Sequence, residues 1–154
     1  KYGMVISESQ TNGKGQYGRK WISYKGNLFV TFFHEVNKIK LSIATITKLN
    51  CLLIKKLISK YTYKKILYKK PNDLFIDKKK ICGILQEIIF MQNKKYLITG
   101  IGININKSPY IKKCPTTNLN ELTNKHIKIN EIEKSLKQIF ENNLLKMYNL
   151  KVNS

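Results

Sequence analysis

The sequence predicts an α+β fold, with one mixed, largely antiparallel sheet and helices packed against one side of it. Short runs of β-branched and aromatic residues alternate with turn residues, and two longer stretches repeat apolar residues at helical intervals. The chain has 154 residues and 42% hydrophobic content, which suffices for one core. We therefore expect a single domain over residues 1–154.

Six segments are expected to be strands. Residues 3–7 and 27–35 flank a polar loop. Residues 66–68, 74–76, 81–91 and 96–105 follow, with turns at residues 71–72 and 77–80. Because short turns join these last four segments, they should pair as a meander.

Two amphipathic helices are expected, over residues 41–61 and 130–148. Glu131 and Glu133 suit the N-terminal dipole of the second helix. The apolar stripes are predicted at Ile43, Ile46, Leu49, Leu53 and Leu57 in the first helix, and at Ile132, Leu136, Ile139, Phe140 and Leu144 in the second.

Composition restricts the location and the partners. A net charge of +20 suits an anionic partner, but Lys, Asn, Ile and Tyr are enriched together, as a genome rich in A and T would also produce. No apolar run reaches the roughly 18 residues of a membrane span, and no export signal opens the chain. The three cysteines lack metal or redox spacing. We expect reduced thiols, a cytoplasmic location and no membrane partner.

The segment TNGKGQYGRKW, residues 11–21, holds the only arginine of the chain, Arg19. Its glycines would let backbone N–H groups approach a phosphate, and its cations would stabilise the charge of phosphoryl or adenylyl chemistry. It matches neither a Walker A sequence nor a dinucleotide-binding fingerprint. Taken alone, it could equally be an ordinary surface loop. The glycines are Gly13, Gly15 and Gly18, and the cations are Lys14, Arg19 and Lys20.

The segment KKPNDLFIDKKKICGILQE, residues 69–87, combines a turn at Pro71 with Asn72 and Asp73 at the start of a strand. Lys80 comes seven residues later, immediately before an apolar strand. There its ammonium could hold a substrate carboxylate and then an acyl phosphate. The alternative is that residues 78–80 form a solvated hairpin tip.

The segment GIGININ, residues 100–106, places Gly100 and Gly102 on one face of a strand, followed by Asn104. Glycine inside a strand is costly unless another backbone or a ligand comes close. The pattern predicts a flat ligand lying on this face, although tight packing against a helix would explain one of the glycines.

The motifs QTNGKGQYGRKW, KKPNDL, KKICGILQE and GIGININ, in this order and spacing, resemble the catalytic domain of biotin protein ligases. The resemblance covers about residues 3–106, and PTTNL and the last helix continue it more loosely. It implies the fold shared by class II aminoacyl-tRNA synthetases and lipoate ligases. It also implies that biotin and ATP, with Mg²⁺, form biotinyl-5'-AMP, from which biotin passes to a lysine of a carboxylase carrier domain.

The resemblance assigns roles to individual residues. Lys80 falls on the lysine that touches the biotin carboxylate and the α-phosphate, Asp73 on the aspartate that orients or deprotonates the attacking lysine, and Arg19 on a loop arginine. These three are the expected catalytic residues. The loop over biotin and adenylate is matched by Gln10, Gly13, Gly15, Gly18, Arg19 and Trp21, the Asn-Asp pair by Asn72 and Asp73, the biotin pocket by Gly83 and Leu85, and the strand near the adenylate by Gly100, Gly102 and Asn104.

The chain departs from the family pattern in three ways. The family's GRGR is GKGQ here, so Lys14 keeps a positive charge and Gln16 removes one that helps to hold the adenylate. Lys70 replaces an aromatic residue that packs under the loop. The upstream Ser-Thr-Asn segment and the small β-barrel domain are not in this sequence, so we expect a fragment of a longer protein.

Other interpretations stay open. A lipoate or octanoyl ligase or transferase shares the implied fold, and the charge leaves a basic nucleic-acid-binding module as an alternative of a different class. A degenerate, inactive ligase is compatible with Gln16 and Lys70. The expected partner is the biotin carrier domain of acetyl-CoA carboxylase or a related carboxylase, with no specific nucleic acid and no side-chain metal site; a homodimer is compatible with this. His34 and His126 are expected to be structural, and Cys82 to be a small apolar pocket residue.

Overall fold

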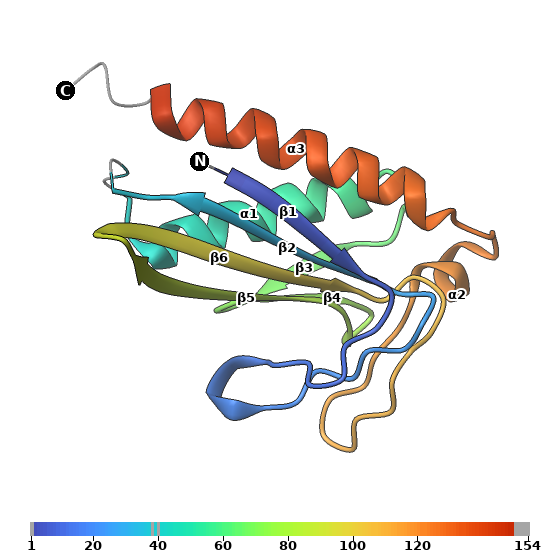
Figure 1. Cartoon of the computed structure of the whole chain (residues 1–154). Helices are drawn as coiled ribbons and strands as arrows, with labels where there is room; N and C mark the ends of the chain where they lie inside the picture. The colour runs from blue at the N-terminus through green and yellow to red at the C-terminus, as the bar shows by residue number, and fades with distance from the viewer. Residues whose placement is uncertain (1, 38, 40, 150–154) are drawn as a thin grey trace.

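The computed structural model describes residues 2–37, 39 and 41–149, and shows one sheet with two long helices on one of its faces (Figure 1). The strands are β1 (Tyr2–Ser7), β2 (Leu28–Glu35), β3 (Ile66–Lys69), β4 (Asp73–Ile76), β5 (Lys79–Met91) and β6 (Lys94–Ile103). The helices are α1 (Ile43–Ile58), α2 (Leu119–Thr123) and α3 (Ile129–Asn149), with one 3₁₀ turn at Gln16–Gly18. The expected α+β architecture is confirmed.

The six strands lie in the order β1-β2-β6-β5-β4-β3, and every pairing between them is antiparallel. Strands β3 to β6 form the expected meander. Parallel pairing is confined, in the described part of the chain, to isolated bridges between Lys25 and Asn27 and between Lys80 and Thr116. The prediction of a largely antiparallel sheet is therefore confirmed.

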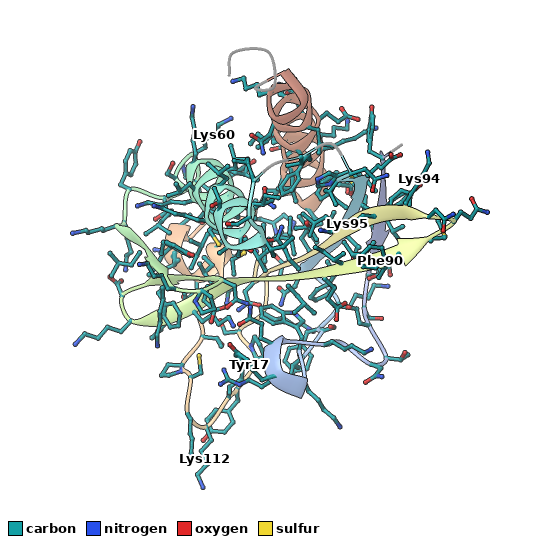
Figure 2. The ribbon with its side chains drawn as sticks, turned by 90° about the vertical axis from the view of Figure 1, so that its left-hand side faces the viewer. Tyr17, Lys60, Phe90, Lys94, Lys95 and Lys112 are labelled. Carbon is teal, nitrogen blue, oxygen red and sulfur yellow. The ribbon has the colours of Figure 1, made fainter. Side chains whose placement is uncertain are left out.

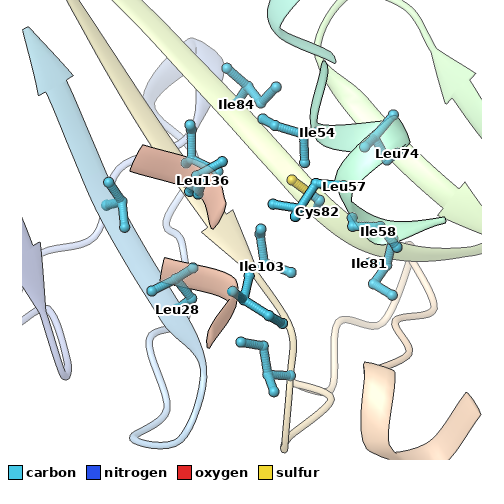
Figure 3. Packing of buried hydrophobic residues seen from close by; sticks show 14 of the residues in the cluster. Leu28, Ile54, Leu57, Ile58, Leu74, Ile81, Cys82, Ile84, Ile103 and Leu136 are labelled. Carbon is cyan, nitrogen blue, oxygen red and sulfur yellow. The ribbon is translucent and has the colours of Figure 1, made fainter. Parts of the chain in front are cut away.

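Alternation along the strands gives the sheet two different faces. Leu28, Val30 and Phe32 of β2 point to the helices and are at most 3% exposed. The central cluster joins these side chains to α1, α3 and the inner faces of the other strands, and Figure 3 shows Cys82 and Ile103 beside Ile54 and Leu57. Burying this apolar surface is the main stabilising contribution to the fold.

The stripe predicted for α3 is correct, whereas that of α1 is displaced around the helix. Of the predicted stripe, Ile46 and Leu57 are buried, whereas Ile43, Leu49 and Leu53 are only partly buried. Several leucines and isoleucines follow one another in this segment, so periodicity alone did not select the buried face. The buried residues of α1 are Ile46, Thr47, Asn50, Cys51, Ile54, Leu57 and Ile58.

The hairpin between β4 and β5 is shorter than expected. Its turn contains only Asp77 and Lys78, both with positive φ, and Lys79 already begins β5. Lys80 therefore belongs to a strand and not to a solvated hairpin tip. The short helix α2 was not predicted; Asn118 is its N-cap, and the Asn118 side chain accepts the Glu121 N–H.

No helix of the described part of the chain covers the second face of the sheet. Two loops, blue and orange in Figure 1, pass below it: the glycine-rich loop (residues 11–21), between β1 and β2, and the wall loop (residues 107–116), between β6 and α2. Among the described residues, no helix is long and apolar enough to cross a membrane.

Candidate active site

A cleft of about 820 Å³ lies between the open face of the sheet and the two loops. Figure 2 shows Tyr17 of the glycine-rich loop and Lys112 of the wall loop on the same side of the sheet, away from Lys60. The site residues predicted from sequence that line this cleft are Gln10, Lys14, Gly15, Gln16, Arg19, Trp21, Asn72, Asp73, Lys80, Gly83, Leu85, Gly100, Gly102 and Asn104.

The two remaining predicted residues, Gly13 and Gly18, line a neighbouring cavity of about 570 Å³ between the glycine-rich loop and β5. Sequence-distant segments thus meet at one place. Residues 72–73, 80–85 and 100–104 come together because strands β4, β5 and β6 are adjacent in the sheet, and loop residues 10–21 join them through Trp21, whose ring lies against Gly83 and Gly102.

The glycine-rich loop is folded on itself by backbone hydrogen bonds. The Gly15 N–H donates to the Arg19 carbonyl at 2.7 Å, and the Trp21 N–H donates to the Gly13 carbonyl at 2.8 Å. Gly18 has φ +72, and a Cβ at Gly13 would collide with the Trp21 carbonyl. The glycines thus permit a tight loop whose cations, Lys14, Arg19 and Lys20, line the cleft.

A β-bulge directs Lys80 into the cleft. The register of β4 and β5 pairs Leu74 with Cys82 but Phe75 with Lys80, so Ile81 is an extra residue on β5. Without this bulge, Lys80 would share the core face of Cys82. Instead Ile81 is fully buried and Lys80 turns to the open face, where it lines the cleft.

The ammonium of Lys80 has two partners within the site. Its Nζ lies 2.8 Å from Oδ1 of Asp73 and forms an ion pair with it, although the geometry is not that of a well-aligned hydrogen bond. The same Nζ lies 5.0 Å from the centroid of the Trp21 ring. The side chains of Lys80 and Asp73 are 17% and 22% exposed. Partial burial weakens the screening by water, so this pair is stronger than one at the surface.

The floor of the cleft is occupied by Trp21. A Cβ built at Gly83 would lie 2.6 Å from the Trp21 ring, and one built at Gly102 would lie 2.5 Å from it. These glycines face each other across β5 and β6. The flat group on this strand is therefore the indole of the protein itself and not the ligand that the glycine pattern predicted. At Gly100 an added Cβ would lie 3.7 Å from its nearest neighbour, the Leu85 carbonyl oxygen, so packing against Trp21 does not require glycine there.

Two asparagines at the cleft are engaged with the backbone. Asn72 donates through Nδ2 to the Ile84 carbonyl at 2.6 Å, which holds the start of β4 against β5 next to Asp73. Asn104 is 1% exposed, and its amide contacts Asn27 and the Lys80 carbonyl. Both arrangements fix the position of neighbouring residues, and the buried Asn104 amide is little accessible to a ligand.

Cations outnumber carboxylates around the cleft. Lys113 joins the three loop cations and Lys80, whereas Asp73 and Glu87 are the carboxylates that line it among the described residues. Such a surface favours a polyanion with several negative charges, and Gln16 lies beside these cations without contributing a charge.

Cys82 does not belong to the cleft, which corrects the expectation of a pocket residue. It is fully buried on the opposite face of the sheet, and burial raises the pKa of its thiol well above the ordinary value (Figure 3). Of the three residues expected in the biotin pocket, Gly83 and Leu85 line the cleft, whereas Cys82 lies in the core beside Ile81. Burial also raises the pKa of Cys51 to about 12. All three thiols are unpaired.

His34 lies on the core face and is 2% exposed, away from the cleft. Burial lowers its pKa from 6.5 to about 4, and neither ring nitrogen has a hydrogen-bond partner among the described residues. It takes no part in the candidate site. His126 is exposed and likewise does not line the cleft.

The wall loop was not predicted as part of the site. Pro109, Ile111, Lys113, Cys114 and Thr116 of this loop line the cleft. The loop contains no recognisable chemical motif, because its residues contribute to the cleft only through their position in the fold. The PTTNL segment (residues 115–119), which includes the last two residues of the loop, was the available signal: Pro115 and Thr117 bond to the backbone of Lys80.

The chain belongs to the biotin/lipoate A/B protein ligase family, which matches residues 1–104. The bifunctional ligase/repressor BirA of Bacillus subtilis is 30% identical over 108 residues, covering 69% of this chain and 33% of BirA. The chain therefore spans about a third of the length of this relative.

Solved structures agree with this relationship. Biotin protein ligase from Aquifex aeolicus in complex with biotin and ATP superposes with a TM-score of 0.81 at 28% identity, covering 95% of this chain and 62% of that chain. The ligase from Leishmania major in complex with biotinyl-5-AMP gives a TM-score of 0.76 at 26% identity, covering 90% and 63%.

Proposed function

We propose that this chain is the catalytic part of a biotin protein ligase. In the first step a carboxylate oxygen of biotin attacks the α-phosphorus of ATP, and the bond to the departing pyrophosphate breaks. In the second step a lysine amine of the carrier domain attacks the carbonyl of biotinyl-5'-AMP, and AMP leaves. The observation that carries this proposal is the bulge that turns Lys80 into the cleft beside Asp73 and Trp21.

Electrostatics explains why the site needs its cations. A carboxylate is repelled by the triphosphate that it must attack, and cations near both groups reduce this repulsion. Lys80 would contact the biotin carboxylate and the α-phosphate, while Arg19, Lys14 and Lys20 would approach the phosphates from the loop. The described residues hold no group of three metal-ligating side chains, so Mg²⁺ would be bound mainly through the phosphates of ATP.

Asp73 would act through its position. Its ion pair with Lys80 places the ammonium at the centre of the cleft, and in the second step its carboxylate would orient or deprotonate the amine of the carrier lysine. Biotin is largely apolar, and the surface formed by Gly83, Leu85 and the indole of Trp21 suits such a molecule.

The acceptor would be the biotin carrier domain of acetyl-CoA carboxylase or a related carboxylase. We place the reaction in the cytoplasm, since three unpaired thiols suit a reducing compartment. A lipoate or octanoyl ligase is the second candidate, because the matching family includes lipoate ligases.

One experiment tests the whole proposal. The full-length gene product is incubated with ATP, labelled biotin and a carrier domain, and labelled carrier is measured, with a carrier lacking the acceptor lysine as control. We expect transfer that requires ATP and resists competition by lipoate. Transfer of lipoate in place of biotin would support the second candidate, and no transfer of either would indicate an inactive ligase.

A further inference from the structure

Asn27, immediately before β2, holds the beginning of the wall loop. It is 3% exposed, and its Oδ1 accepts the backbone N–H groups of Ile105, Asn106 and Lys107, each at 3.0 Å. Its Nδ2 donates to the Lys107 carbonyl at 2.9 Å. Only a side chain that both accepts and donates can satisfy this arrangement, and a primary amide does so.

The peptide groups of Lys80 hold the other end of the wall loop. The Lys80 N–H donates to the Pro115 carbonyl at 2.7 Å, and the Lys80 carbonyl accepts the Thr117 N–H at 3.0 Å. Strand β6 leaves the sheet after Ile103, which pairs with Cys82. Residues 115–117 therefore occupy the place beside β5 that β6 has left, at the bulge that presents Lys80.

Asn104 connects the two ends. Its Oδ1 accepts a long hydrogen bond from Asn27 Nδ2 at 3.4 Å, and its Nδ2 lies 3.5 Å from the Lys80 carbonyl. Its backbone N–H donates to the Ile81 carbonyl at 2.9 Å. Asn27, the wall loop, Lys80 and Asn104 thus form a closed circuit of contacts around one side of the cleft.

We propose that Asn27 is a positioning residue for Lys80. By fixing the start of the wall loop and the amide of Asn104, it sets the backbone from which the Lys80 side chain enters the cleft. Asn27 is not among the residues that line the cleft, so it acts through others. The catalytic consequence rests on the proposed function of Lys80, whereas the effect on the position of Lys80 does not.

The competing explanation is that Asn27 only satisfies buried N–H groups. The variant Asn27→Asp separates the two explanations, because a carboxylate can still accept the three N–H groups but cannot donate to Lys107 or Asn104. The negative charge of the aspartate also faces the Asn104 Oδ1 and the Lys107 carbonyl oxygen, which accept hydrogen bonds from the amide of Asn27 in the wild type. The variant therefore keeps the turn and breaks the links to the rest of the circuit.

The first readout is the reaction of Lys80 with trace acetic anhydride, measured by mass spectrometry without substrate. We expect Lys80 of folded Asn27→Asp to react about fivefold faster than in the wild type, the factor that corresponds to one net hydrogen bond. The second readout is pyrophosphate release, in which we expect KM for biotin to rise by a similar factor. Lysines outside the cleft serve as internal references.

Ile46→Val is the stability-matched control, since Ile46 is 1% exposed in a separate cluster with Val36 and Leu97. It should leave both readouts unchanged. Should Asn27→Asp not fold, Asn104→Asp breaks the contact with the Lys80 carbonyl and is tested by the labelling of Lys80 alone, because Asn104 itself lines the cleft. An unchanged labelling rate of Lys80 in a folded variant would overturn the proposal. Faster labelling in a protein that does not use biotin would support the positioning role and contradict the proposed function.

Discussion

The indole of Trp21 lies directly on the backbone of Gly102, where any side chain would collide with ring atoms Cε2 and Cζ2. Gly83, the cross-strand partner of Gly102, forms the other half of this seat. The Nζ of Lys80 lies 5.0 Å from the ring centroid. Two glycines on neighbouring strands thus allow the indole to lie close to the sheet. The position of the indole in turn determines the shape of the surface beside Lys80.

Gly102→Ala should displace the indole of Trp21 from its contact with Gly83 and Gly102. We expect pyrophosphate release with biotin and ATP to fall about tenfold and the free energy of unfolding to fall by about 1–3 kcal/mol, because the new methyl group overpacks the contact. Trp21 is the single tryptophan of the chain, so its fluorescence spectrum reports the displacement directly.

Gly100→Ala is the matched control on the same strand face. The nearest atom to its Cβ would be the Leu85 carbonyl oxygen at 3.7 Å, an ordinary contact. This variant should keep the tryptophan fluorescence of the wild type, because the new methyl group does not reach the indole. If Gly102→Ala behaved in the same way, the indole would not occupy this seat in solution.

Lys80→Ala should abolish biotinyl-AMP formation, with a loss of at least about 100-fold in rate, because a cation is removed from the position where negative charge accumulates. The fold should remain, with a loss of no more than about 1–2 kcal/mol in the free energy of unfolding, since Asp73 is partly solvated. Pyrophosphate release and thermal unfolding measure the two effects.

Lys79→Ala provides the control for the charge. Lys79 precedes Lys80 but is exposed, and its Nζ lies 3.9 Å from Glu121 outside the cleft. The variant should retain nearly full activity. Near-normal pyrophosphate release in Lys80→Ala would remove the central assignment of the site.

The sheet and its open face followed from local patterns. Period-two alternation identified the strands, and the alternating Gly100 and Gly102 indicated a close approach by something flat. The pattern did not indicate that Trp21 fills this place, because the indole arrives from a loop whose path depends on contacts distant in sequence. The glycine pattern also did not show that, of Gly100 and Gly102, only Gly102 lies under the Trp21 ring.

Lys80 was predicted both from its place before an apolar strand and from the resemblance, but its geometry depends on a feature that sequence does not reveal. A bulge shifts the register by one residue, which moves a side chain from one face of the sheet to the other. Asn27 was missed for a similar reason. Its partners lie 77 to 80 residues away, and an asparagine before a strand usually indicates only a turn.

Gln16→Arg should slow the release of biotinyl-AMP. Gln16 lines the cleft near Lys14 and Arg19, so an arginine there would add a charge-assisted hydrogen bond to the adenylate. We expect the dissociation rate to fall about tenfold, measured by chasing labelled biotinyl-AMP with unlabelled biotin and ATP.

Tyr17→Arg adds the same charge at the neighbouring position, where the side chain is 87% exposed and outside the main cleft (Figure 2). It should change the dissociation rate much less. Equal effects of the two variants would indicate a general electrostatic attraction, and no effect of Gln16→Arg would show that position 16 does not contact the adenylate.

His34 should make the fold sensitive to mild acid. Its folded pKa of about 4 lies below the ordinary 6.5, so the unfolded chain binds the proton more tightly. The full stability is therefore present above pH 6.5 and is lost as the pH falls toward 4. Linkage predicts that the free energy of unfolding decreases by about 2 kcal/mol between pH 7 and pH 5.

His34→Leu removes this titration and keeps an apolar group among the buried residues. Urea unfolding at pH 7 and pH 5 should show a much smaller difference for this variant than for the wild type, whereas His126→Leu, at an exposed site, should retain the wild-type difference. Most carboxylates titrate below this interval, so they contribute little to the comparison. An equal loss of stability in His34→Leu and the wild type would mean that water reaches the imidazole in solution and that the core is open at this end of the sheet.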